Sequence, residues 1–131
     1  MPYIGELINQ GTGFLWTGRG VITGQELIQG GESELSLSPA PELITHSLVD
    51  FSQVTTLEVT IDEVLKVGEI DKQTAKTIKT LFMAVVVPTN LMKYLSAVYT
   101  DLNAPPGWTV QTFNNRHDAE RWLASVVTNI K

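Results

Sequence analysis

Few residues of this sequence have the type and spacing that a known catalytic or metal site requires. Cysteine is absent, which excludes disulfides, thiolate zinc sites and a cysteine nucleophile. The two histidines, His46 and His117, form neither H-x-x-x-H nor H-E-x-x-H, so we expect no metal site. Neither the nucleotide-binding motif G-x-x-x-x-G-K-[ST] nor the serine hydrolase motif G-x-S-x-G occurs. We therefore predict no catalytic residue and no cofactor.

The glycines around Arg19 only partly match a phosphate-binding loop. In Gly18-Arg19-Gly20 with Gly24, the last glycine lies one position too far along for G-x-G-x-x-G. No acidic residue follows at a convincing ribose-binding position. We interpret the segment as a turn that needs glycine geometry.

Polar residues that follow the predicted parallel strands form the candidate ligand site. Open α/β sheets bind ligands beyond the carboxyl ends of their strands. The candidates there are Ser52, Thr89, Asn90, Asn115 and Arg116. Arg116 and Arg121, with the backbone amides at the start of the last helix, would suit an anion. The interleaved acids Asp118 and Glu120 oppose that use.

Three lysines are weaker candidates for a binding surface, and one threonine is a weaker candidate for a phosphorylation site. Lys72, Lys76 and Lys79 are spaced i, i+4 and i+7, which predicts one helix face. That face would suit an acidic partner or an anionic membrane surface, although a solvated helix exterior is the simpler interpretation. Thr60 and Glu63 form a capping box, so we interpret Thr60 as a helix cap rather than a phosphorylation site.

Hydrophobic periodicity and helix caps predict the elements that position these residues. Strands are expected at 3–10, 14–17, 44–51, 81–87 and 108–113, and the fourth is the central one. Helices are expected after the caps Thr23, Thr60, Asp71, Thr89 and Asn115. We expect Gly30-Gly31 to end or weaken the first helix and Gly68 to end the second. Residues 32–41 should form mainly an exposed loop, with continuation of the first helix into 32–37 as the alternative, because no strict breaker lies there.

The resulting order, β-β-α-β-α-α-β-α-β-α, predicts an α/β fold. The sheet should be mixed and mainly parallel, of about five strands, with an antiparallel hairpin at the N-terminal edge. A chain of 131 residues is expected to form a single domain spanning 1–131. The apolar stripe of the last helix predicts a buried Trp122.

Charge and hydropathy exclude two classes of partner. The net charge is −5, with eleven acids against two bases in the first 71 residues, which disfavours nucleic acid. The longest apolar stretch, 82–88, is too short to cross a bilayer, and the N-terminus carries no secretory signal pattern. We therefore expect a soluble cytoplasmic protein without stable membrane insertion.

Several of these features together resemble a known family. The N-terminal hairpin, the strand ending Val49-Asp50-Phe51-Ser52-Gln53-Val54, the central apolar strand, and Phe113 followed by Ala119 and Trp122-Leu123 are similar to SpoIIAA-like, or STAS-like, domains. These are bacterial relatives of the sulfate-transporter and anti-sigma-factor-antagonist domain. The resemblance implies an α/β sheet and a regulatory or protein-interaction role rather than catalysis.

The family's phosphorylatable serine motif is not matched. In the antagonists an Asp-Ser-Ser-Gly stretch carries the phosphoserine at a helix N-terminus. Here Glu58 falls at the acidic position and Val59 at that of the serine, the glycine is missing, and Thr60 is the nearest hydroxyl.

Two functions remain as hypotheses. The first is a non-catalytic regulatory or protein-interaction domain that acts through an acidic or apolar surface patch, with an unknown protein partner or as a homodimer. The alternative is a small-molecule binding protein or enzyme that takes an anion or a lipid-like ligand at the carboxyl-end loops. A pocket lined by Ser52, Asn90 and Arg116 would favour the alternative.

Overall fold

A five-stranded mixed sheet organises the chain. The structure, a computed structural model, describes residues 2–127 of the 131. The strands lie in the order β1-β2-β3-β4-β5. They are β1 (Tyr3–Ile8), β2 (Gly13–Thr23), β3 (His46–Glu58), β4 (Leu81–Val86) and β5 (Trp108–Phe113). β1 is antiparallel to β2, and the other neighbours are parallel. The predicted α/β class and mainly parallel sheet are confirmed.

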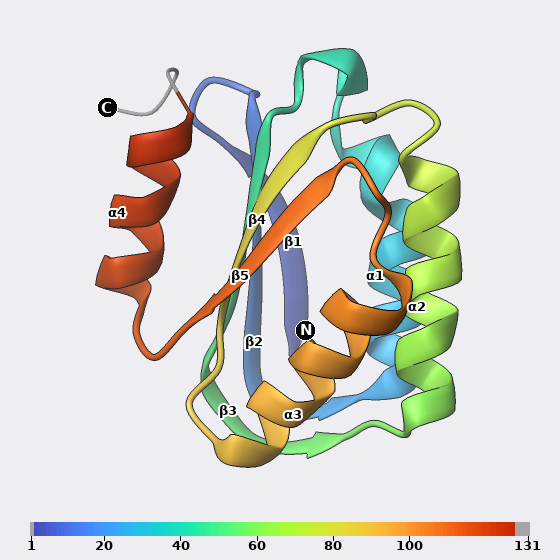
Figure 1. The fold of residues 1–131 in the computed structure, drawn as a ribbon, viewed down its shortest axis with the longest axis vertical. Coiled ribbons are helices and arrows are strands. Elements are labelled where there is room, and N and C mark those ends of the chain that lie inside the picture. The colour runs from blue at the N-terminus through green and yellow to red at the C-terminus, as the bar shows by residue number, and fades with distance from the viewer. Residues whose placement is uncertain (1, 128–131) are drawn as a thin grey trace.

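The sheet is centred on β3 rather than on β4. β4, which the sequence predicted as the central strand, lies between β3 and the edge strand β5. β2 and β3 are longer than predicted and stay paired as far as Thr23 and Glu58. Gly18-Arg19-Gly20 therefore lies within β2, not in the predicted turn, and the register with β3 shifts twice there. Such irregularities bend a strand, and the far ends of β2 and β3 curl under the helices in Figure 1.

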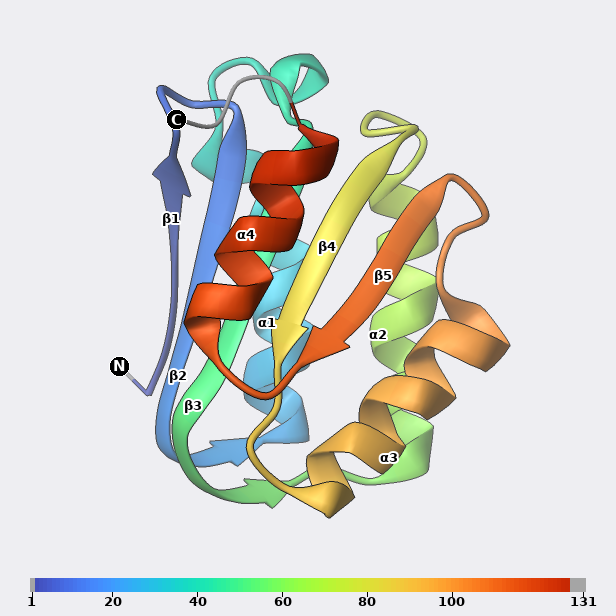
Figure 2. The ribbon, with the colours of Figure 1, turned by 60° about the vertical axis from the view of Figure 1, so that its left-hand side comes forward.

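Helices cover both faces of the sheet unequally. The helices are α1 (Gly24–Ser33), α2 (Ile61–Thr74), α3 (Asn90–Val98) and α4 (Arg116–Val126). Short 3-10 turns span Glu34–Leu37 and Pro41–Leu43, and a π-helical turn spans Tyr99–Asn103. Figures 1 and 2 show α1, α2 and α3 on one face of the sheet and α4 on the other. The caps predicted at Thr23 and Thr60 are confirmed, and both form capping boxes.

Two predicted helix ends are wrong. α1 continues through Gly30-Gly31, and the two helices predicted on either side of Gly68 are the one helix α2. A Cβ at Gly30 would lie 2.8 Å from the Tyr3 ring, and one at Gly68 would lie 1.8 Å from the Asn103 amide nitrogen. These glycines permit close packing against neighbouring elements, which outweighs their cost to the helix.

The sheet separates two hydrophobic cores. The larger core, beneath α1, α2 and α3, contains Trp16, Phe51 and Trp108. The smaller core, beneath α4, is built on Leu48, Val86 and Leu123 and other small aliphatic residues. Trp122, predicted as a buried core residue, is only half-buried at the margin of this second core. Its ring centre lies 6.0 Å from that of Phe82 and 5.7 Å from that of Phe113.

Candidate functional site

Two of the predicted site residues, Ser52 and Arg116, meet at Asp50, where the pairing of β3 with β4 ends. Ser52 therefore lies within β3 and not in the predicted loop beyond a strand end. The buried carboxylate of Asp50 accepts a hydrogen bond from the Ser52 backbone N–H at 2.8 Å. The same carboxylate lies 3.5 Å from the Arg116 guanidinium. Arg116 also binds Glu120 on the next turn of α4, at 3.2 Å. The guanidinium is thus shared between two carboxylates, an arrangement that joins α4 to β3.

The other three predicted residues begin helices. The Thr89 hydroxyl accepts the Met92 N–H and starts α3, and the Asn115 side chain accepts the Asp118 N–H and starts α4. Asn90, the first residue of α3, is exposed. Thr89 and Asn90 belong to the helix on one face of the sheet, and Asn115 and Arg116 to the helix on the other. The five residues are exposed, and ligand binding by them stays a prediction.

Thr60 is a helix cap. Its hydroxyl accepts the Glu63 N–H at 3.1 Å, and the Glu63 carboxylate accepts the Thr60 N–H at 2.9 Å. A reciprocal pair of this kind satisfies two free amides of the first turn of α2. Phosphorylation would add negative charge beside Asp62 and Glu63.

The three lysines do not share one helix face. Lys72 lies in the last turn of α2, 3.7 Å from Glu69, whereas α2 ends at Thr74, before Lys76 and Lys79. The predicted stripe failed because the chain turns at 75–77 and leaves the helix. All three side chains are exposed.

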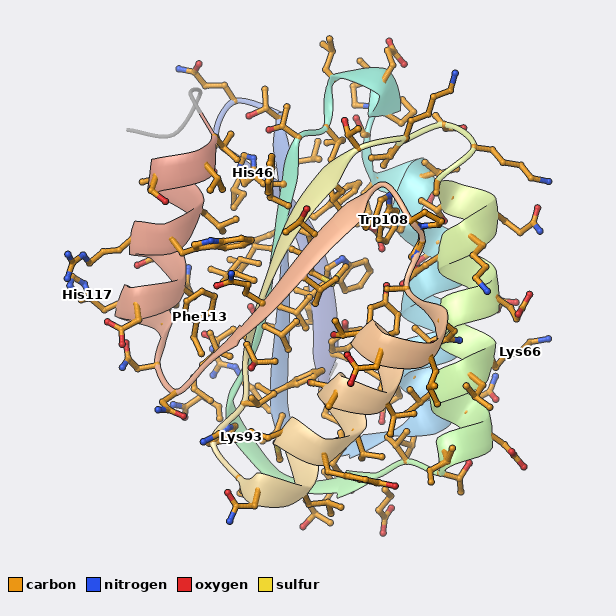
Figure 3. The ribbon with its side chains drawn as sticks, viewed as in Figure 1. His46, Lys66, Lys93, Trp108, Phe113 and His117 are labelled. Carbon is orange, nitrogen blue, oxygen red and sulfur yellow. The ribbon has the colours of Figure 1, made fainter. Side chains whose placement is uncertain are left out.

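The two histidines lie in opposite environments. His46 is fully buried at the start of β3, where its ring nitrogens lie 2.8 Å from the Thr45 hydroxyl and 2.7 Å from the side-chain amide oxygen of Asn9. Burial lowers the pKa of His46. His117 projects outward from α4 (Figure 3). Within residues 2–127, no cluster of histidine, aspartate and glutamate has the arrangement of a metal site.

A partly open cavity lies in the larger core, away from all five predicted site residues. A second, shallow hollow of about 260 Å³ lies beside it, between β1 and α1. The cavity in the larger core has a volume of about 120 Å³ and lies between the α1–α3 layer and the sheet. Apolar side chains make most of its wall, among them Val49, Val64, Met83, Val85 and Leu95. Its titratable lining residues are Tyr3, Glu34, Asp71 and Tyr99.

Several polar atoms on the cavity wall lack hydrogen bonds. The Glu34 Oε1, the Ser47 Oγ and the Trp16 indole nitrogen are buried without a partner in the part of the chain that the structure describes. Asp71 is better satisfied, because the Tyr99 hydroxyl donates to its Oδ2 at 2.6 Å. Buried polar atoms nearly always find partners, since an unmade hydrogen bond costs about 1–3 kcal/mol. We therefore take the cavity as the candidate functional site.

Burial raises the pKa values of both acids of this cavity. Desolvation, with a further contribution from the nearby Asp71 charge, raises the pKa of Glu34 to about 8. Desolvation raises the pKa of Asp71 to about 7, against the opposing effect of the Tyr99 hydrogen bond. Burial and the two carboxyl groups raise the pKa of Tyr3 and of Tyr99 well above the ordinary tyrosine value. Near neutral pH the cavity therefore holds protons that exposed carboxylates would have lost.

The sequence analysis missed this site. Glu34 lies in a serine-rich segment that we expected to be an exposed loop, yet it is 6% exposed in a 3-10 turn. Asp71, which we predicted as a helix N-cap, lies in the last turn of α2 and is 5% exposed. The available signal was a weak one: Asp71 falls on the same side of a continuous α2 as Val64 and Val67, at i+7 and i+4.

Comparisons with known proteins identify the fold. No protein-family profile matches the sequence. No curated protein matches it either. Among solved structures, the anti-sigma factor antagonist SpoIIAA in its unphosphorylated form aligns with a TM-score of 0.57 and 8% identity, over 95% of this chain and 99% of SpoIIAA. An uncharacterised DUF3478 protein with a SpoIIAA-like fold from Shewanella loihica PV-4 aligns with a TM-score of 0.55 and 20% identity, over 92% and 91% of the two chains.

This chain therefore has the SpoIIAA-like fold that its sequence pattern resembled. Within residues 2–127, none of the helices combines the length and the apolar character needed to cross a membrane.

Proposed function

We propose that this chain is a non-catalytic regulatory domain that binds another protein through the outer side of α3. The observation that carries the proposal is a row of exposed apolar side chains there. Leu91, Tyr94 and Leu102 are 57%, 55% and 69% exposed, on α3 and the π-helical turn that continues it. Single exposed apolar residues are ordinary, but a group on one element is typical of a protein-binding surface.

The spacing of these residues supports a common face. Leu91 and Tyr94 are three residues apart, and Leu102 follows the half-buried Val98 by four. The adjoining side of α3 packs Met92 and Leu95 into the larger core. The helix is thus anchored by one side and offers the other to a partner. SpoIIAA is an anti-sigma factor antagonist, a protein that acts on another protein, and the shared fold supports a role of the same kind.

The alternative function, binding of an anion or a lipid-like molecule at the carboxyl-end loops, has less support. The pocket that it required would be lined by Ser52, Asn90 and Arg116, and the cavity of about 120 Å³ is lined by other residues. The Arg116 guanidinium, which would recognise an anion, is held by Asp50 and Glu120.

The experiment compares a variant of the surface with a matched control. Leu91→Ser with Leu102→Ser removes most of the row, whereas Leu43→Ser removes a side chain of similar exposure, 58%, in a different part of the molecule. Sedimentation velocity first establishes whether the wild-type chain associates with itself. A photo-reactive residue at position 94, introduced in cells of the source organism, then captures any other partner, which mass spectrometry identifies.

The proposal predicts one of two outcomes. Either the wild type and Leu43→Ser dimerise while the double variant is monomeric, or crosslinks from position 94 capture one protein, and the double substitution abolishes that crosslink. A chain that stays monomeric and gives the same crosslinks from positions 94 and 43 would contradict an interaction role for this surface.

A further inference from the structure

The cavity in the larger core has the size of a small-ligand site. Its volume of about 120 Å³ is close to that of an engineered protein cavity of roughly 150 Å³ that binds benzene. A ligand here would be a small ring or a short alkyl chain, far smaller than a nucleotide or a fatty acid. Val49, Val85 and Leu95 offer such a body an apolar wall.

The polar groups of the cavity gather toward one end. α1, α2 and α3 each begin near the carboxyl ends of the parallel strands and run back along the sheet (Figure 1). Glu34 directly follows α1, Asp71 lies in the last turn of α2, and Tyr99 directly follows α3. Glu34, Asp71 and Tyr99 thus lie near the last residues of α1, α2 and α3. Apolar wall residues such as Leu57, Val59 and Met92 lie instead near the starts of α2 and α3. The cavity is amphipathic along its length.

This polar end is built to receive positive charge. The C-terminus of a helix carries the negative end of its dipole and favours cations, and α2 ends at Thr74, one turn after the buried Asp71. The lining residues include no lysine, arginine or histidine. Glu34 Oε1 and Ser47 Oγ are acceptors without a partner among the described residues. The ionised forms of Glu34 and Asp71 would repel an anion, and a wholly apolar molecule would leave these acceptors unsatisfied.

We infer that this cavity binds a small primary amine, with its ammonium group at Glu34, Asp71 and Ser47 and its apolar body against Val49, Val85 and Leu95. An ammonium group has three donors and matches a set of carboxylate and hydroxyl acceptors. Binding of the ammonium group replaces one of the protons that the two acids hold in the empty cavity. The inference is independent of the partner surface on α3, because it concerns the inner side of that helix.

Three probes of one shape test the class of ligand. Benzylamine, benzyl alcohol and benzoate differ mainly in a positive, neutral or negative head group. Binding is followed by the indole N–H resonances in ¹⁵N-resolved NMR spectra. Trp16 lines the cavity, and Trp122 on the other face of the sheet is an internal control. We expect benzylamine to shift the Trp16 resonance and leave Trp122 unchanged, benzyl alcohol to bind at least tenfold more weakly, and benzoate not to bind.

The dependence of benzylamine affinity on pH and on Glu34 distinguishes an ammonium-binding site from a purely apolar cavity. The titratable groups that face the site are Glu34, Asp71, Tyr3 and Tyr99, from four different elements. Below the Glu34 pKa of about 8, benzylamine affinity should rise with pH by up to about tenfold per unit, with release of about one proton measured by calorimetry in two buffers. Glu34→Gln should lower benzylamine affinity at least tenfold and spare benzyl alcohol. Glu32→Gln, at an exposed neighbour, should change neither.

Each opposite result overturns the inference. If none of the three probes moves the Trp16 resonance, the cavity is not a site for this class of ligand. If benzyl alcohol or benzoate binds as tightly as benzylamine, the head group is not a cation. If Glu34→Gln, shown by its NMR spectrum to be folded, keeps wild-type benzylamine affinity, the polar end does not recognise the ligand.

Discussion

Glu34 is the most unusual residue of the chain, because it is an acid buried beside another acid. Desolvation opposes its ionised form, and Asp71 adds repulsion, so the folded protein holds a proton there up to a pKa of about 8. An unfolded chain would release the same proton near the ordinary value of 4.5. The folded state is therefore more stable when Glu34 is protonated than when it is ionised.

This difference makes stability depend on pH in an uncommon direction. The folded-state pKa values of Glu34 and Asp71, about 8 and about 7, lie above their ordinary values of 4.5 and 3.8. Between the ordinary and the folded-state pKa values, the folded state binds more protons than the unfolded state. The free energy of unfolding therefore falls as pH rises. The stabilisation is fully present below about pH 4 and is lost once pH exceeds about 8.

We predict that Glu34→Gln is more stable than the wild type at pH 8, by on the order of 4 kcal/mol, and that the difference falls to about 1 kcal/mol or less at pH 5. The amide keeps the size and polarity of the protonated acid but has no charge to bury. Urea denaturation at several pH values measures the effect. Glu32→Gln, at an exposed neighbour, should follow the wild type throughout. A Glu34→Gln protein that loses stability with pH as steeply as the wild type would show that Glu34 does not carry the proton.

At the scale of elements, α2 depends on a close contact with the π-helical turn Tyr99–Asn103. The Asn103 amide nitrogen donates to the Leu65 carbonyl oxygen at 2.7 Å, and the amide group occupies the space beside Gly68. Gly68→Ala would raise helix propensity by up to about 1 kcal/mol. The added methyl has no room unless Asn103 moves.

We predict that Gly68→Ala destabilises the protein by about 1–3 kcal/mol despite its better propensity. Asn103→Ala removes both the clash and the hydrogen bond, so the double variant should be more stable than the sum of the single changes implies. A double-mutant cycle by chemical denaturation measures this coupling, expected at about 1 kcal/mol or more. Strictly additive effects would mean that the two residues do not share the space.

Signals confined to a few neighbouring residues predicted the elements well. The capping boxes at Thr23 and Thr60 and the caps at Thr89 and Asn115 place four helix starts correctly, because each motif closes its hydrogen bonds within three residues. Glycine was misread at Gly68 and at Gly30, since a glycine that ends a helix and one that lets another element approach look alike in sequence. The second case depends on contacts with distant residues.

The candidate site was beyond the reach of such signals. Glu34 is surrounded in sequence by serines and acids, which are typical of a solvated loop, and its burial follows from α1 continuing into a 3-10 turn over the sheet. Ser47 and Asp71 reach the same cavity from β3 and α2. Polar residues that converge from distant segments leave no spacing pattern. The carboxyl-end residues were predicted from a general rule about where the loops of open sheets lie, and this rule misplaced Ser52, which belongs to β3.

At the scale of the whole molecule, the two faces of the sheet are packed differently. Under α4 the core is made of aliphatic residues such as Leu48, Ala84 and Leu123, which are nearly inaccessible. Under α1, α2 and α3 the core holds a cavity and buried polar atoms without partners among the residues described. Native proteins pack their interiors densely and tolerate such defects mainly where function requires them. We therefore interpret the α4 side of the sheet as structural. The α1–α3 side retains the proposed ligand site at a cost in stability.

Ser47 allows this trade-off to be measured. It is 1% exposed on β3, its hydroxyl has no partner within residues 2–127, and it lines the cavity between its strand neighbours Phe14 and Met83. Valine at this position would remove the unsatisfied hydroxyl, fill part of the cavity and suit a central strand. We predict that Ser47→Val raises the free energy of unfolding by about 1–2 kcal/mol.

The same substitution should change how the whole molecule responds to pressure. Pressure favours unfolding because voids of the folded state disappear, so a smaller cavity makes the volume change of unfolding less negative. High-pressure fluorescence should show this for Ser47→Val and not for Ser52→Val, which alters an exposed residue of the same strand. Benzylamine should bind the stabilised variant more weakly than the wild type. A Ser47→Val protein that is less stable than the wild type, with an unchanged volume of unfolding, would mean that the cavity is already filled in solution and that Ser47 has a partner there.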